Sequence, residues 1–172
     1  MAGPALKRLS GLLVAWLMLA TSPAPAQPEV FGRWQPQPRR CALEQQGASP
    51  LSCHGFQLDQ RNAEVVRLIL QAEGAGRGEQ VQLTLVGSLV EGSEPMRCRS
   101  GSCTLRKPMQ VQLVSLSLAR FDGRGLAQTL PSTWPVQGQC HVEPALLSCQ
   151  ASSRPLSRFE STASWSVNAE LD

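Results

Sequence analysis

Six cysteines are the residues whose chemistry and spacing say most about this chain of 172 residues. They form three neighbouring pairs, each enclosing a short loop and separated from the next pair by a long span without cysteine. The pairs have the spacings C-x11-C, C-x4-C and C-x8-C: Cys41 and Cys53, Cys98 and Cys103, Cys140 and Cys149. Six cysteines in an exported chain are typical of a disulfide framework. We therefore expect each pair to be bridged, with a gain of about 2 to 3 kcal/mol per bridge.

The N-terminal segment indicates that the chain is exported. Lys7 and Arg8 precede an apolar run over residues 9–20, and Ala24 and Ala26 occupy the small-residue positions of a cleavage site. The apolar run is shorter than the roughly 20 residues that a membrane-spanning helix needs. We interpret residues 1–26 as a signal peptide, and we predict a periplasmic or secreted protein that does not span the membrane after cleavage.

Metal binding is the first alternative to disulfides, because two histidines adjoin cysteines. His54 follows Cys53 and His141 follows Cys140, and both residue types bind zinc or copper. The spacings C-x2-C and H-x3-H of zinc sites are absent, and so is the C-x-x-C-H of c-type haem attachment. The sequence therefore favours disulfides, and it predicts neither a metal site nor a cofactor.

Thiol redox chemistry at Cys98 and Cys103 is the second alternative. Arg97, Arg99 and Arg106 flank this pair, and positive neighbours favour the reactive thiolate. A thioredoxin-like site needs the spacing C-x-x-C at the start of a helix, however, and this pair is spaced more widely. We favour a bridged β-hairpin tip and keep a redox role as the alternative.

The chain between the cysteines shows the period-two alternation of β-strands. Residues 79–91 read EQVQLTLVGSLVE and residues 109–121 read MQVQLVSLSLARF, with apolar and polar residues alternating in both. The second run changes parity between Leu113 and Val114, which predicts a β-bulge or a bend. We expect the two runs to pair as a long antiparallel hairpin, with the Cys98 to Cys103 tip between them.

Two other segments are less regular. Residues 62–74 begin and end with Asn62 and Gly74, which suit a helix, but their centre VVRLIL is rich in β-branched residues and favours a strand. Residues 27–40 are rich in proline and glutamine, which predicts a flexible, extended lead.

The remaining residues, 41–172, have the length of one domain. We predict a mostly β domain, an antiparallel sandwich or a barrel-like fold stapled by three short-range disulfides.

A weak internal repeat accompanies the cysteine loops. LSC closes both the first and the third loop, and further residues match at offsets of 96 to 100 positions. The matching pairs are Trp34 and Trp134, Cys41 and Cys140, Glu44 and Glu143, and QAE at 71–73 and NAE at 168–170. These matches suggest a duplicated strand-loop-strand unit, and chance matches among abundant residues are the alternative.

Charge and motifs narrow the classes of function. The chain has 16 Lys and Arg against 13 Asp and Glu, and loss of Lys7 and Arg8 leaves it close to neutral. Aromatic residues do not interleave with the cations, so no nucleic-acid partner is predicted. No G-x-S-x-G, H-E-x-x-H or P-loop pattern occurs. We predict that the protein is not an enzyme, with an extracytoplasmic enzyme as the alternative.

The run MRCRSGSCTLRK, residues 96–107, is the candidate binding site. It places Arg97, Arg99, Arg106 and Lys107 on a tip closed by two cysteines. Arginines at alternate strand positions point the same way and suit bidentate contact with carboxylate or phosphate. We predict an exported, non-catalytic binding or structural protein of the cell envelope whose partner is an anionic glycan, a lipid headgroup or an acidic protein surface. The alternative is that these charges only keep the hairpin tip soluble and prevent an edge strand from pairing with another chain.

Overall fold

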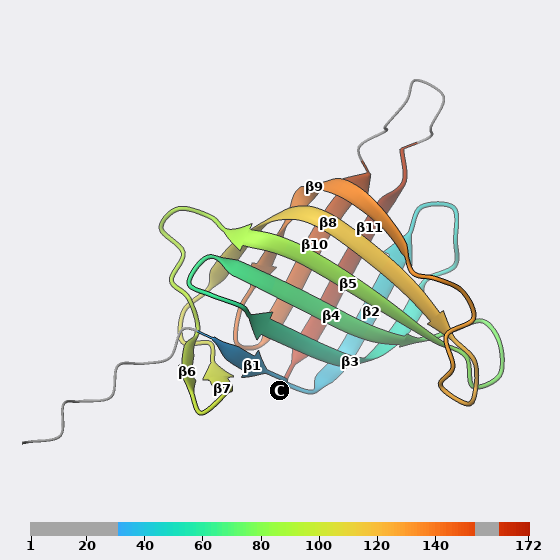
Figure 1. Ribbon diagram of the computed structural model, residues 1–172, viewed down its shortest axis with the longest axis horizontal. Helices are drawn as coiled ribbons and strands as arrows, with labels where there is room; N and C mark the ends of the chain where they lie inside the picture. Colours follow the sequence, from blue (N-terminus) through green and yellow to red (C-terminus); the bar gives the residue numbers. More distant parts are fainter. Residues whose placement is uncertain (1–30, 154–161) are drawn as a thin grey trace, which may run out of the picture.

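The computed structural model describes residues 31–153 and 162–172, and it folds them into strands without a helix (Figure 1). The predicted signal peptide, residues 1–26, lies outside the described residues. Within the described ranges, no helix is long and apolar enough to cross a membrane. The strands are β1 (Gly32–Trp34), β2 (Pro38–Gln45), β3 (Leu51–Gln60), β4 (Val65–Glu73), β5 (Gln80–Leu89), β6 (Arg97–Arg99), β7 (Ser102–Thr104), β8 (Met109–Phe121), β9 (Ser132–Val142), β10 (Leu146–Ser153) and β11 (Ser164–Leu171).

Eight of these strands close into an antiparallel barrel. Strands β2, β3, β4, β5, β8, β9, β10 and β11 each pair with the next barrel strand along the chain, and β11 pairs back onto β2. This is the topology of an up-and-down barrel, in which closure removes the free sheet edges. The predicted mostly β, barrel-like domain is confirmed. One end of the barrel carries the connections 46–50, 74–79 and 122–131, and we call it the loop end.

The alternating side chains of the barrel strands fill its interior. In β5 the buried positions are Val81, Leu83 and Leu85, and in β4 the buried positions are likewise every second residue. Eight strands enclose a space just wide enough for side chains to fill. The core is therefore apolar, built mostly from leucine and valine with Phe56, Met109 and Trp165.

The predicted β5 and β8 hairpin and its bulge are both present. β5 pairs antiparallel with β8 from Gln80 opposite Phe121 to Leu89 opposite Val111. The register of β8 shifts between Leu113 and Ser115 relative to β9. Val114 is the extra residue, and its side chain is 53% exposed although it is apolar. The bulge lets the residues on either side of it, Leu113 and Leu116, both point into the core.

Residues 65–73 form strand β4, as the β-branched centre of this segment predicts. Asn62 caps a turn instead of a helix: its side-chain Oδ1 accepts hydrogen bonds from the backbone amides of Glu64 and Val65, at 2.9 and 2.7 Å. An asparagine side chain accepts hydrogen bonds from backbone amides both at the start of a helix and in a turn. Asn62 alone therefore does not distinguish a helix from a turn.

The flexible lead predicted for residues 27–40 differs from the structure over its described part. Residues 32–34 form β1, and β2 begins at Pro38. β1 pairs with the part of β3 that β2 leaves free, with Trp34 opposite Leu58. The ring of Trp34 also packs edge-on against Phe56, with 6.0 Å between centroids. Tertiary pairing and one partly buried aromatic contact therefore outweigh the local preference of a proline-rich segment.

Strands β6 and β7 form a short hairpin that covers the other end of the barrel, which we call the hairpin end (Figure 1). The hairpin pairs with β1 through β7, in parallel. Met96, Cys98, Cys103 and Leu105 from this segment are buried and belong to the same core cluster as the barrel side chains. The hairpin thus closes the barrel with apolar contacts.

All three disulfides have the predicted pairing. Cys41 is bonded to Cys53, Cys98 to Cys103 and Cys140 to Cys149. They join neighbouring strands: β2 to β3, β6 to β7 and β9 to β10. Among the described residues no cysteine is free.

The suggested duplication does not appear as a symmetric pair of halves. In barrel order β9 lies five steps beyond β2. Neighbouring strands of this barrel are antiparallel, so β2 and β9 run in opposite directions while following the same circular order. A rotation cannot relate two such units, and the matched residues do not occupy symmetric places.

Candidate functional site

The predicted basic residues lie on the exposed side of the β6 and β7 hairpin. Arg97 and Arg99 are exposed on either side of buried Cys98, so their side chains point away from the barrel core. Thr104 and Ser102 are their direct cross-strand partners. Arg106 follows in the connection to β8 and is exposed as well. The alternation that the sequence indicated is therefore present.

Lys107 differs from the three arginines because it forms an ion pair with Glu94. The hydrogen bond from Lys107 lowers the pKa of Glu94, and the charge of Arg97 adds to this effect. Both partners are exposed, so the pair contributes little to stability. Its consequence is local: the lysine charge is largely neutralised, and the free positive charge of the segment rests with the arginines.

Register extends the basic site beyond the predicted run. Arg99 lies opposite Ser102, and Ser102 lies opposite Arg33 on β1. Arg33 lies opposite Asp59 on β3, and Asp59 lies opposite Arg67 on β4. One row across five strands therefore carries three arginines and one carboxylate. We call Arg33, Arg67, Arg97 and Arg99 the basic face.

Asp59 holds two arginines of the basic face in place. Its Oδ1 accepts a hydrogen bond from Nε of Arg33 at 2.9 Å, and its Oδ2 accepts one from Arg67 at 2.6 Å. Gln57 donates a further hydrogen bond to Oδ1 at 2.8 Å. Burial raises the pKa of Asp59, but the hydrogen bonds from Arg67 and Arg33 outweigh it and leave the pKa below its ordinary value. Asp59 is therefore ionised at neutral pH, and the two arginines share one counter-charge.

Arg33 and Arg67 were not among the predicted binding residues. Arg33 lies in the segment that was expected to be flexible, and Arg67 is one cation within an apolar strand. The sequence offers one indication of this contact. Asp59 follows the apolar Leu58, and a carboxylate that becomes buried in the fold needs a charged or hydrogen-bonding partner. The sequence alone does not indicate which residues are the partners of Asp59.

A shallow depression of 410 Å³ adjoins the basic face at the hairpin end. Its lining residues are Phe31, Gly32, Arg33, Asp59, Gln60, Arg61 and Gly101. Two arginines against one aspartate give this depression a net positive charge. It is open to solvent, and its shape suits contact with a group on a larger partner better than enclosure of a small molecule.

The candidate redox pair is enclosed. The Cys98 and Cys103 side chains are 4% and 3% exposed. Gly32 of β1 lies against this bridge, because a Cβ built on Gly32 would come within 2.7 Å of the Cys103 sulfur. Thiol–disulfide exchange needs access of a thiolate to one sulfur. The packing therefore supports a structural bridge.

No group of three metal-ligating side chains occurs within residues 31–153 and 162–172. The two histidines lie on different strands. His54 is on β3, and His141 on β9 has its Nε2 2.9 Å from Oε1 of Glu143 in an exposed contact. This pair lies at the protein surface beside a turn, and His141 also lines a small pocket of 190 Å³ together with uncharged residues.

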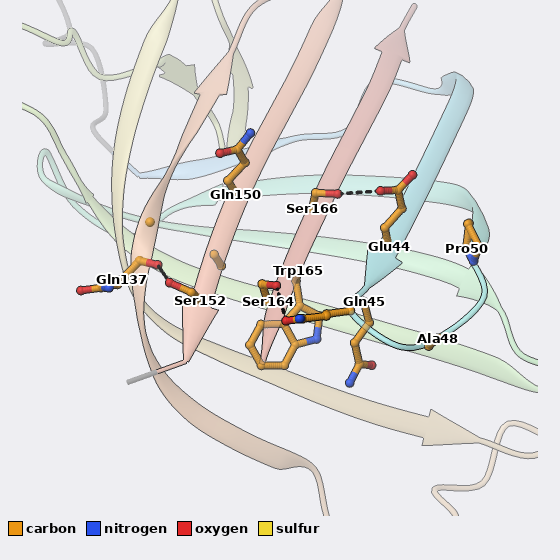
Figure 2. Close-up of a pocket in the computed structure, with 13 residues that line it drawn as sticks. Glu44, Gln45, Ala48, Pro50, Gln137, Gln150, Ser152, Ser164, Trp165 and Ser166 are labelled. Atoms are coloured by element: carbon orange, nitrogen blue, oxygen red, sulfur yellow. Dashed lines mark hydrogen bonds between the residues drawn. The ribbon is translucent and has the colours of Figure 1, made fainter. Parts of the chain in front are cut away.

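A polar groove of 670 Å³ runs along the outer surface of β2, β11, β10 and β9, and Figure 2 shows its lining. Some of its polar side chains form hydrogen bonds with one another. The Ser166 hydroxyl donates to Glu44 at 3.1 Å, and the Ser164 hydroxyl donates to the side-chain oxygen of Gln46 at 2.9 Å. The groove is lined by Glu44 and otherwise by uncharged residues, so it does not favour an anion.

Comparisons with known proteins do not indicate a function for this chain. No protein-family model, no curated protein and no solved structure matches this chain.

Proposed function

We propose that this is an extracytoplasmic, non-catalytic binding protein whose basic face contacts an anionic partner. The observation that carries the proposal is the cross-strand row of Arg99, Arg33 and Arg67. Three intramolecular disulfides are consistent with an oxidising compartment. The partner presents carboxylate, sulfate or phosphate groups on an extended chain or surface.

The spacing of the row supports a partner with repeated anionic groups. Strands lie about 4.8 Å apart, and the three arginines occupy every second strand, so their Cα positions repeat at about 10 Å. A single small anion is too small to contact all three. A polyanion or an anionic surface contacts them together, and each contact strengthens the next through effective concentration.

Rigidity adds to the suitability of this face. The Cys98 to Cys103 bridge ties β6, which carries Arg97 and Arg99, to β7, and Asp59 fixes Arg33 and Arg67. Side chains that are ordered before binding lose less entropy when the partner binds. Arginine suits this role because its planar fork makes bidentate contacts with carboxylate and phosphate.

The test uses two variants of equal charge. The first replaces Arg97 and Arg99 of the basic face by glutamine at the hairpin end. The control replaces Arg77 and Arg124 by glutamine at the loop end, which removes the same net charge. Binding is measured to immobilised heparin, to phosphatidylglycerol vesicles and to polyglutamate, so that glycan, lipid and acidic polypeptide are compared directly.

We expect the hairpin variant to lose at least tenfold in affinity for one of these partners, and the control to change less than twofold. Circular dichroism checks that both variants keep their strands. Equal losses in both variants would show that only net charge matters and would reject the basic face. Failure of the wild-type protein to bind any of the three at low salt would reject the proposed function.

A further inference from the structure

The interior of the barrel is not filled completely at the loop end. A cavity of 220 Å³ lies there, lined by inward-facing residues of β2, β3, β5, β8 and β11 and by two turns. The lining residues are Leu43, Gln45, Ala48, Ser49, Leu51, Ala75, Val81, Leu118, Arg120 and Trp165. The hairpin covers the opposite end of the barrel, so this cavity is reached from the loop end.

The walls of the cavity are largely apolar. Leu43, Leu51, Val81 and Leu118 contribute aliphatic surface, and Trp165 contributes an aromatic ring. A cavity of about 150 Å³ lined by such side chains is known to hold benzene. At 220 Å³ this cavity has room for a compact apolar body of about eight to ten heavy atoms.

Trp165 brings an unpaired hydrogen-bond donor to this cavity. The residue is 4% exposed, and its indole Nε1 has no hydrogen-bond partner in the described part of the chain. Buried donors are paired in the great majority of native structures, because an unpaired one costs free energy. The ring packs against Trp134 with 5.2 Å between centroids, which holds its orientation. In Figure 2 the indole nitrogen lies on the edge of the ring turned toward Gln45, another lining residue.

Arg120 gives the cavity a positive charge at its rim. It lies near the end of β8, lines the cavity and is exposed. It forms no ion pair with any residue of 31–153 or 162–172. No acid lines the cavity among the described residues. The site therefore combines apolar walls, one buried N–H donor and one unpaired guanidinium.

We infer that the loop-end cavity binds a small monocarboxylic acid with a compact apolar body, aliphatic or aromatic. The apolar body packs against the leucines and the ring of Trp165. An acceptor oxygen of the ligand receives the Trp165 N–H, and the carboxylate charge faces Arg120. A neutral or cationic molecule of equal size can at most pack against the walls and interact with the Trp165 N–H. It brings no negative charge to Arg120. This site lies at the end of the barrel opposite the hairpin and does not depend on the basic face.

The experiment follows indole N–H signals in the ¹⁵N-labelled protein lacking residues 1–26, which retains Trp34, Trp134 and Trp165. The probes are octanoate, octanol and octylammonium, which share one chain and differ in charge. Trp165→Phe assigns the Trp165 signal. We expect octanoate to shift the Trp165 indole signal in a saturable manner, to leave Trp34 unchanged, and to bind at least tenfold more tightly than octylammonium.

Three variants separate the parts of the proposal. Arg120→Gln is expected to weaken octanoate binding about tenfold and to leave octanol binding within twofold. Arg77→Gln removes an exposed arginine from a loop at the same end without lining the cavity, and it should change neither. Ala75→Trp fills the cavity from an exposed loop and should abolish binding of both probes. Circular dichroism and thermal melting show whether each variant is folded.

Two results overturn the inference. If octanoate produces no saturable shift of the Trp165 signal, or the same shift in Ala75→Trp, the cavity is not a ligand site. If octanoate and octanol bind equally and Arg120→Gln changes neither, the site does not recognise an acid. Binding to the basic face is unaffected by either outcome.

Discussion

Gln60 on β3 and Met96, just before β6, hold each other by two hydrogen bonds. The Gln60 Nε2 donates to the Met96 carbonyl at 3.2 Å, and the Met96 amide donates to Gln60 Oε1 at 2.6 Å. Both residues are buried. One side-chain amide therefore satisfies a backbone amide and a carbonyl that the core would otherwise leave unpaired, and it anchors the hairpin to the barrel.

Replacement of Gln60 by methionine should destabilise the protein by about 2 to 4 kcal/mol, because two buried backbone groups lose their partners. Gln110→Met, at an exposed position of β8, is the control and should lie within about 0.5 kcal/mol of wild type. Urea denaturation gives the free energy of unfolding of both. A cost for Gln60→Met as small as that of the control would mean that the anchor is energetically unimportant.

The Asp59 carboxylate makes stability depend on pH in a defined direction. Its pKa in the folded protein lies below its ordinary value, which is about 3.9 in an unfolded chain. The stabilisation from its ionised form is therefore fully present above the unfolded pKa, and it is lost as the pH falls through the folded pKa. This window lies below about pH 4.

Asp59→Asn should accordingly lower the free energy of unfolding by about 1 to 3 kcal/mol at pH 7, since two charge-assisted hydrogen bonds are weakened. The difference between variant and wild type should shrink as the pH falls from about 5 toward 2. Denaturant unfolding at a series of pH values measures it. Two curves that stay parallel down to pH 2 would contradict the assignment of this acid dependence to Asp59.

Gly32 should not tolerate a side chain. A Cβ there would lie 2.7 Å from both the Cys103 sulfur and the Gly101 carbonyl oxygen, and φ is +150°. We expect Gly32→Ala to cost about 2 to 4 kcal/mol, from backbone strain and overpacking together. Gly47→Ala is the matched control: φ is +80°, but no atom lies within 4 Å of its Cβ. It should cost only about 1 kcal/mol.

Hydrogen exchange at Arg33 distinguishes a local effect from a global one. The Arg33 amide donates to the Gly101 carbonyl at 2.8 Å. In Gly32→Ala this amide should lose protection before the amides of β5 do, because the clash separates β1 from the hairpin. Equal loss of protection in β5 would show that the substitution destabilises the whole barrel instead.

The disulfides should differ in their effect according to the loop that each closes. The bridges Cys41 to Cys53 and Cys98 to Cys103 enclose separations of 12 and 5 residues. In the chain-entropy model, paired replacement by alanine should cost about 3 kcal/mol for the first and about 2 kcal/mol for the second. Thermal unfolding of the two double variants tests the order. A larger cost for the shorter loop would indicate that packing around Cys98 and Cys103 exceeds the entropic effect.

Several features were predictable because they depend on residues close together in sequence. The alternation in residues 79–91 and 109–121 predicted β5 and β8, and the parity change at Val114 predicted the bulge. The three disulfides followed from short loops. Arg97 and Arg99 were expected on one exposed face because residues two apart on a strand point the same way. Each of these inferences needed only a local period or a short separation.

The sequence by itself determined the strands, the disulfide pairs and a bridged tip with outward arginines, because strand periodicity and loop closure act over a few residues. Only the tertiary structure decided the closure of β11 onto β2, the docking of β1, the row of Arg99, Arg33 and Arg67, and the cavity beside Trp165. These features depend on register between segments distant in the chain. Register is decided by the packing of one shared core, and no single segment contains that information.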